Sequence, residues 1–142
     1  MKIFDLSRFI FAQENRNTFS VALHELQNGK KVSHWIWFVF PQLQGLAKSP
    51  TSDYFGISGI AEAKAYMDDP ILSSRLIEAV QAMLQHREKT AAEVLGHTDS
   101  KKFQSSMTLF REAAPDISVF DDALGMFYAG KPDYQTLRLL EE

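Results

Sequence analysis

A block of aromatic residues in the N-terminal part of the chain is the best place for a functional site. It runs from Ser33 to Gln42 and holds both tryptophans, Trp35 and Trp37, beside His34. A buried indole N–H needs a hydrogen-bond partner, so polar groups must converge on the same place. Apolar walls with a few fixed polar groups are typical of a ligand pocket. They are equally typical of an ordinary core, which is the commoner role of buried aromatic residues.

His34 is the side chain in this block that is best suited to acid–base work. Imidazole titrates near neutral pH, and aromatic neighbours would desolvate it. It could act as acid, base or ligand donor, with the Gln42 amide as a second polar group on the same block. The alternative is a histidine at a helix start whose ring nitrogens bind backbone or water.

A second candidate lies between Asp99 and Thr108, where hydrogen-bond donors stand beside an apolar stripe. Lys102 and Ser106 are four residues apart and share one face of a helix, with Ser105 next to them. An ammonium group beside a hydroxyl suits phosphate binding or activation of the hydroxyl. Alternatively, the small hydroxyl residues allow close helix packing while the lysine points to solvent. No glycine-rich phosphate loop supports the first interpretation.

Glu62 is the third candidate, on a short predicted helix with Tyr54 before it and Tyr66 one turn after it. A carboxylate framed by tyrosines could act as a general base or bind a ribose diol. The alternative is an acidic residue in the first turn of a helix, where the helix dipole favours it. The histidines are scattered without the spacing of a metal site, so we expect no metal, and the sequence identifies no cofactor.

Composition excludes several classes of function. The 142 residues fit one domain, residues 1–142, and the absence of cysteine rules out disulfides and thiolate metal sites. A formal charge of −3, with no basic tract, argues against bulk nucleic-acid binding. The start, from Met1 to Asp5, lacks the apolar stretch of a signal peptide, and no later segment is apolar enough to span a membrane. We therefore expect a cytoplasmic protein without a membrane partner.

The spacing of apolar residues predicts a single compact all-α domain of about eight helices. One long loop, from Pro41 to Gly59, is expected directly after the aromatic block, as a rim or lid. A helix C-cap is expected at Asn28-Gly29. Helix N-caps are expected at Ser33, Asp69, Thr90, Asp99, Ser118 and Asp133.

Short motifs along essentially the whole chain occur in an order that is specific to one family. They are Arg8-Phe9, Ala12-Gln13, Gly29-Lys30, Ser33-His34-Trp35, Trp37-Phe38, Phe40-Pro41-Gln42, Gly45-Leu46, Ser49-Pro50, Tyr54, Glu62-Ala63, Tyr66, Pro70, Arg75-Leu76, Gly96, Asp99, Lys102, the run from Ser105 to Phe110, Gly130, Asp133 and Thr136-Leu137. In these motifs the chain resembles the bacterial domain-of-unknown-function 1810 family. The resemblance implies a mainly α-helical fold and no settled activity.

Three positions depart from the family pattern. Ala47 and Ser73 stand where the family tends to have glycine, and Asp69 where it tends to have histidine. Members sometimes carry the label "calpastatin", but nothing in this chain resembles a disordered protease-inhibitor repeat. A fainter likeness, at Glu62-Ala63, Lys102-Phe103, Leu124 and Gly130, is to proteins proposed to act on ADP-ribose and related N-glycosides.

The favoured function is binding of a small nucleotide-like or phosphorylated ligand in a pocket beside the aromatic block. If the fainter likeness extends to N-glycoside hydrolysis, Glu62 is the catalytic carboxylate and His34 and Lys102 position phosphate. Trp35 or Trp37 would then stack on a base or ring.

The enzyme hypothesis requires His34, Gln42, Glu62 and Lys102 to converge on one cleft. A binding module needs the same cleft without an acid and a base within reach of one atom. The alternative is a non-enzymatic interaction or adaptor domain, in which the aromatic block is only core or a flat exposed patch.

Overall fold

Helix-end residues set most element boundaries in the computed structural model, which describes residues 3–142. Met1 and Lys2, the first residues of the stretch weighed against a signal peptide, lie outside the described residues. The elements are α1 (Ser7–Glu14), the 3-10 turn η1 (Asn15–Asn17), α2 (Thr18–Gln27), α3 (Ile36–Val39), α4 (Pro50–Phe55), α5 (Ile60–Asp68), α6 (Pro70–Leu84), α7 (Ala91–Leu95), α8 (His97–Ala113), α9 (Val119–Tyr128) and α10 (Tyr134–Glu141).

Most of the expected caps are confirmed. The Asp69 carboxylate accepts two backbone N–H groups of the first turn of α6 at 2.9 and 3.0 Å, and Pro70 is the first helical residue. Thr90 and Glu93 form a reciprocal capping box at the start of α7. Gly29 follows α2 with a φ of 78°, a left-handed conformation that favours glycine. These local rules therefore place the helix ends where the sequence predicts them.

Two expected N-caps, Ser33 and Asp99, are wrong. The Ser33 hydroxyl donates to the Glu25 carboxylate on α2, and α3 begins only after Trp35. Helix α8 begins directly after Gly96, whose φ of 91° turns the chain sharply between α7 and α8. Asp99 consequently lies inside the first turn of α8 and binds lysine side chains instead.

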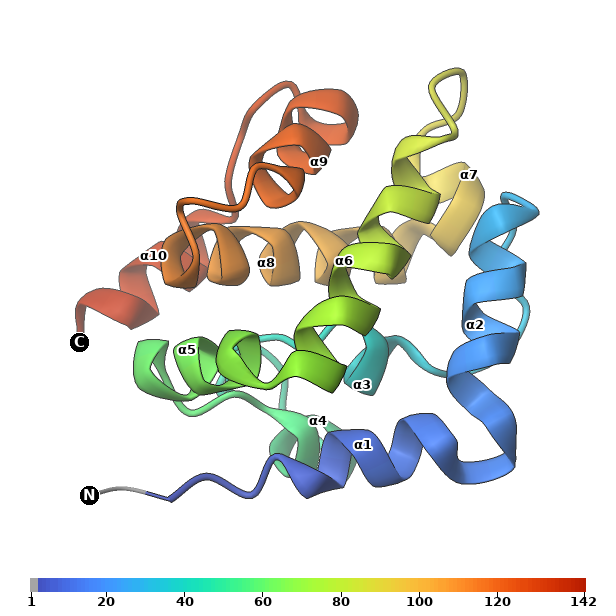
Figure 1. The fold of residues 1–142 in the computed structure, drawn as a ribbon. Helices are drawn as coiled ribbons and strands as arrows, with labels where there is room; N and C mark the ends of the chain where they lie inside the picture. Colours follow the sequence, from blue (N-terminus) through green and yellow to red (C-terminus); the bar gives the residue numbers. More distant parts are fainter. Residues whose placement is uncertain (1–2) are drawn as a thin grey trace.

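The described residues form an all-α fold in which α8 is central. Figure 1 shows α8 crossing the molecule, with α9 on one side and α5 on the other. Helices α7 and α10 also pack against α8, and α6 packs against α2, α5 and α9. The predicted fold class is thus confirmed. Three of the helices, α3, α4 and α7, have six residues or fewer.

The expected long loop from residue 41 to residue 59 is interrupted by α4, which Ser49 caps. Its two arms are held together by an isolated parallel bridge between Leu43 and Ile57. The N–H of Gln44 donates to the carbonyl of Ile57 at 2.8 Å, and the N–H of Ile57 donates to the carbonyl of Gln42 at 2.8 Å. The turn that carries Gln42 is therefore fixed in place by backbone bonds.

Gly56 allows the two arms to approach each other closely. A Cβ atom at this position would lie 2.8 Å from Cβ of Gln44 and 2.8 Å from the backbone oxygen of Ser52. Because backbone cannot move aside, we expect Gly56→Ala to lower the free energy of unfolding by about 1–3 kcal/mol in urea denaturation. Gly125→Ala, at an exposed position of α9 where an added Cβ meets nothing within 4 Å, should instead raise it by about 0.5–1 kcal/mol. Equal effects of the two substitutions would contradict this account.

The aromatic block is split between the core and the surface. Trp35 and Phe40 are fully buried, and the Phe40 ring lies 4.7 Å from that of Phe103 on α8. Trp37 and Phe38 are only partly buried and pack at the edge of the core. The core interpretation therefore holds for Trp35, whereas Trp37 lies at the edge of the core. No helix within residues 3–142 is long and apolar enough to cross a membrane.

Candidate ligand-binding site

Glu25 on α2 holds the chain that leads into the aromatic block. Its carboxylate accepts the N–H groups of Val32 at 2.8 Å and Ser33 at 3.0 Å, and the Trp35 indole N–H at 2.8 Å. Burial raises the pKa of this carboxyl, but the hydrogen bonds from Ser33, Val32 and Trp35 outweigh that effect and lower the pKa to about 2. Trp35 therefore has the polar partner that a buried indole needs, and it is part of the core.

Asp99 on α8 links two lysines that each lie over a tryptophan ring. Its carboxylate binds Lys31 at 2.9 Å and Lys102 at 3.1 Å. The Lys102 ammonium lies 4.1 Å from the centroid of a Trp37 ring, and that of Lys31 lies 5.1 Å from the Trp35 ring. Partial burial raises the pKa of Asp99, but hydrogen bonds from both lysines hold it below its ordinary value. The ionised carboxylate thus fixes Lys102 against the Trp37 ring.

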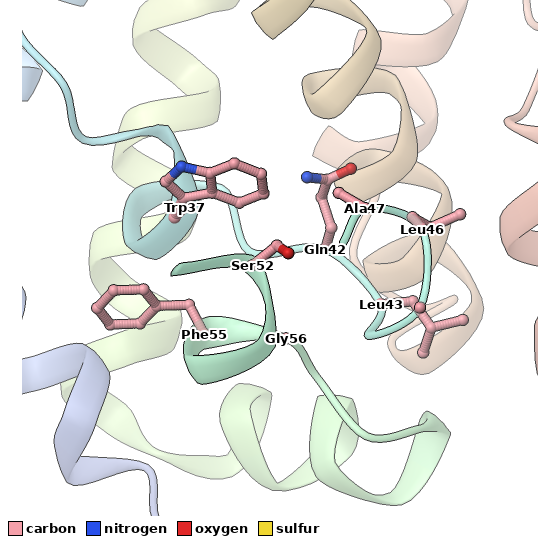
Figure 2. Close-up of a pocket in the computed structure, with 9 residues that line it drawn as sticks. Trp37, Gln42, Leu43, Leu46, Ala47, Ser52, Phe55 and Gly56 are labelled. Atoms are coloured by element: carbon pink, nitrogen blue, oxygen red, sulfur yellow. The ribbon is translucent and has the colours of Figure 1, made fainter. Parts of the chain in front are cut away.

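A cavity of about 330 Å³ opens between the turn after Gln42, the N-terminal half of α8 and the start of α10. We call it the Lys102 hollow. A crevice of about 10 Å³, the space of roughly one water molecule, lies beside Trp37, and Figure 2 shows the residues that line it. The two share Gln42, Leu46 and Ala47 in their walls. The polar side chains of the Lys102 hollow are Gln42, Thr98, Lys101, Lys102, Ser105, Asp133 and Gln135.

The Gln42 amide is the most distinctive group of this site. Gln42 is only 9% exposed, yet its side chain makes no hydrogen bond with any of residues 3–142. In Figure 2 the amide rises between the Trp37 ring and Ala47. The amide atoms themselves reach solvent, because Ser106 Oγ is the one fully buried polar side-chain atom of residues 3–142 that lacks a partner. An unpaired amide that faces a hollow is therefore a group available to a ligand.

One face of α8 supplies most of the other polar groups. Thr98, Lys101, Lys102 and Ser105 follow the i, i+3, i+4, i+7 spacing of a single helix face. The Ser105 hydroxyl donates to Oδ2 of Asp133 at 3.0 Å, which ties α8 to the start of α10. The face therefore presents two ammonium groups and two hydroxyls beside the Gln42 amide.

Of the sequence-predicted site residues, the structure brings four together. Trp37, Gln42, Lys102 and Ser105 line the Lys102 hollow or the adjoining crevice. Trp35 lies in the core. Ser106, also predicted, is fully buried, and its hydroxyl has no partner among the described residues.

Glu62 lies elsewhere, in a buried ion pair with Arg8 of α1. Its Oε2 binds the Arg8 guanidinium at 2.8 Å, and its Oε1 accepts the N–H of Ser58 at 2.8 Å. The same guanidinium donates to the backbone oxygens of Tyr54 at 2.8 Å and Gly56 at 3.0 Å. Both carboxylate oxygens are thus occupied in joining α1, α4 and α5.

The four residues that the enzyme hypothesis places in one cleft do not all line one cavity. Gln42 and Lys102 line the Lys102 hollow, whereas His34 and Glu62 line neither it nor the crevice. His34 is exposed, and so is the side chain of Tyr54, which lies at the surface beside Arg8. In residues 3–142 no three carboxylate or imidazole side chains gather as a metal site would require.

Several residues of the site were not predicted from the sequence as site residues. Lys101 and Thr98 share the helix face of Lys102 and Ser105, so helical spacing alone could have identified them. The sequence identifies Asp133 only as a helix cap, because its place in the wall of the Lys102 hollow depends on how α10 packs on α8. No sequence signal marks Gln135.

Comparison with known proteins agrees with this fold. A solved structure, the crystal structure of the conserved hypothetical protein Rv1873 from Mycobacterium tuberculosis, is 40% identical, with a TM-score of 0.94 over 98% of each chain. Comparison with curated proteins gave no match. The family model described as "Protein of unknown function (DUF1810)" matches residues 3–140. The motif resemblance is therefore confirmed, and the chain belongs to the DUF1810 family.

Proposed function

We propose that this protein binds a small phosphorylated ligand in the Lys102 hollow. The observation that carries the proposal is Gln42, a residue only 9% exposed whose amide has no protein partner, in a cavity that Lys101 and Lys102 also line. Amide N–H groups and ammonium groups are the donors that phosphate oxygens accept. The cavity volume, about 330 Å³, lies at the lower end of the range for small-molecule sites.

The charges around the hollow support an anionic ligand. Lys101 and Lys102 line the hollow together with one carboxylate, that of Asp133, which leaves one net positive charge on its walls. Lys102 is about 20% exposed and held by Asp99, so its ammonium is already positioned. Positioned donors lose less entropy on binding than mobile ones.

Trp37 supplies the aromatic surface that a nucleotide-like ligand would contact. Its ring is partly exposed, lines the crevice with Gln42 and lies 4.1 Å from the ammonium of Lys102, which lines the hollow. Trp35 is excluded from this role, because it is fully buried and its indole N–H is bound by Glu25.

The proposal does not include hydrolysis through Glu62. An N-glycoside hydrolase would need that carboxylate within reach of the ligand, but Arg8 and the Ser58 N–H occupy it. The interaction-domain alternative requires an aromatic block that is only core or a flat exposed patch. Trp35 is core, whereas Trp37 and Gln42 line the crevice beside the hollow, which favours the ligand-binding proposal.

Removing the Lys102 ammonium should weaken binding most. Isothermal titration calorimetry with inorganic phosphate, ribose 5-phosphate, AMP and ADP-ribose should detect binding of at least one phosphate ester. Because a charge-assisted hydrogen bond contributes about 1.5–3 kcal/mol, Lys102→Ala should lower the affinity about 10- to 100-fold. Gln42→Ala should lower it less, by about 3- to 10-fold, since an amide donor is uncharged.

The matched control is Lys64→Ala, which removes an exposed lysine of α5. It should leave the affinity unchanged, and circular dichroism should show that all three variants fold. Higher ionic strength should weaken binding by the wild type, since the site is partly exposed. Equal losses for Lys64→Ala and Lys102→Ala, or no binding of any of the four compounds, would contradict the proposal.

A further inference from the structure

The carboxylate of Asp133 is used on only one of its two oxygens. Oδ2 accepts the Ser105 hydroxyl at 3.0 Å, the N–H of Thr136 at 3.1 Å and the Thr136 hydroxyl. Oδ1 has no hydrogen-bond partner among residues 3–142, and Asp133 lines the Lys102 hollow. The helix cap therefore fixes the carboxylate while one oxygen remains available.

No cationic side chain of residues 3–142 pairs with Oδ1 of Asp133. None of the ion pairs within residues 3–142 includes Asp133, although Lys101 and Lys102 line the same cavity. A carboxylate oxygen repels phosphate and accepts hydrogen bonds from hydroxyl groups. A ligand that places only phosphate in the hollow would displace water from this oxygen without supplying a donor, which is unfavourable.

We infer that Asp133 selects phosphorylated ligands that carry a hydroxyl group, as sugar phosphates do. This inference rests on the proposed function and specifies its ligand. The phosphate lies toward Lys102 and Gln42, and a sugar hydroxyl donates to Oδ1 of Asp133. Asp133 is thus a specificity-determining residue, and Ser105 and Thr136 position it.

The test compares two phosphate esters that differ in hydroxyl groups. Ribose 5-phosphate carries them, and cyclopentylmethyl phosphate has a carbocyclic ring without any. Titration calorimetry on the wild type should give about tenfold tighter binding of ribose 5-phosphate, the effect of one hydrogen bond to a charged group.

Asp133→Asn should reduce this preference. Asparagine also caps helices well, so its amide oxygen takes the place of Oδ2 and its NH₂ group takes the place of Oδ1. The NH₂ group can donate to the oxygen of a sugar hydroxyl, but this neutral hydrogen bond is weaker than one from the hydroxyl to a carboxylate. The ratio of the two affinities should fall from about tenfold to about two- to threefold, while the affinity for cyclopentylmethyl phosphate does not decrease. Asp133→Ser, which keeps a capping oxygen but leaves nothing in place of Oδ1, should lose the preference altogether.

The outcomes separate this inference from the proposed function. If both esters bind but their affinity ratio is the same in wild type and both variants, the inference is overturned and phosphate binding stands. If neither ester binds the wild type, both are overturned. Thermal melting of each variant checks that α10 remains folded.

Discussion

Glu25→Ala is expected to lower the free energy of unfolding by about 3–5 kcal/mol. The carboxylate is 8% exposed and accepts the N–H groups of Val32 and Ser33, the Ser33 hydroxyl and the Trp35 indole. Alanine leaves these donors without a partner, and each unsatisfied buried donor costs about 1–3 kcal/mol. Urea denaturation at pH 7 measures the loss.

Glu25→Gln keeps one acceptor oxygen, so its free energy of unfolding should fall by less than half as much as that of Glu25→Ala.

The carboxyl of Glu25 also makes the stability of the protein depend on pH. Its pKa falls from about 4.5 to about 2 on folding, so its contribution is complete above pH 4.5 and is lost as the pH falls toward 2. The wild type should therefore lose more stability between pH 5 and pH 3 than Glu25→Gln does. An Ala variant as stable as the Gln variant would contradict this role of Glu25.

Arg8→Ala is expected to be comparably destabilising, by about 3–5 kcal/mol. Arg8 and Glu62 form an ion pair with side chains only 10% and 4% exposed. Removing one partner leaves a buried charge uncompensated. The variant also loses the hydrogen bonds to the backbone oxygens of Tyr54 and Gly56, which join α1 to the segment around α4. Thermal and urea unfolding measure the effect.

The double variant Arg8→Ala/Glu62→Ala should recover part of this loss, because it removes the isolated carboxylate as well. Arg8→Lys should not restore full stability, since an ammonium cannot reach all four acceptors of the guanidinium, which are Glu62 and the backbone oxygens of Asp5, Tyr54 and Gly56. If the free energy of unfolding of Arg8→Ala lies within about 1 kcal/mol of the wild-type value, the ion pair does not stabilise this region. Glu62 would then again be open to a catalytic role.

Most of the fold could be predicted because its helix ends follow local rules. Asp69 with Pro70, and Thr90 with Glu93, mark helix starts by residue type alone. Helix α4 was missed since its six residues have too few apolar positions for a helical period. Its Ser49-Pro50 start was nevertheless a readable capping signal.

The site could be predicted only in part, because it depends on contacts between distant elements. The aromatic block and the α8 face around Lys102 stand out by composition and spacing. The contact between the aromatic block and this face of α8 has no signal in the sequence, because it depends on Asp99 holding Lys102 over Trp37. The sequence predicted a catalytic role for Glu62 because it does not show the ion pair with Arg8. Arg8 lies on another helix, and no local pattern joins the two residues.

The most direct test of ligand binding at the Lys102 hollow uses the two indole N–H signals in a ¹⁵N-correlated NMR spectrum. During titration with ribose 5-phosphate, the Trp37 signal should shift saturably, because its ring lies under Lys102 beside Gln42. The Trp35 signal should stay in place, because that indole is buried and bound to Glu25, and it serves as an internal control. No shift of the Trp37 signal, or equal shifts of both signals, would contradict binding at this site.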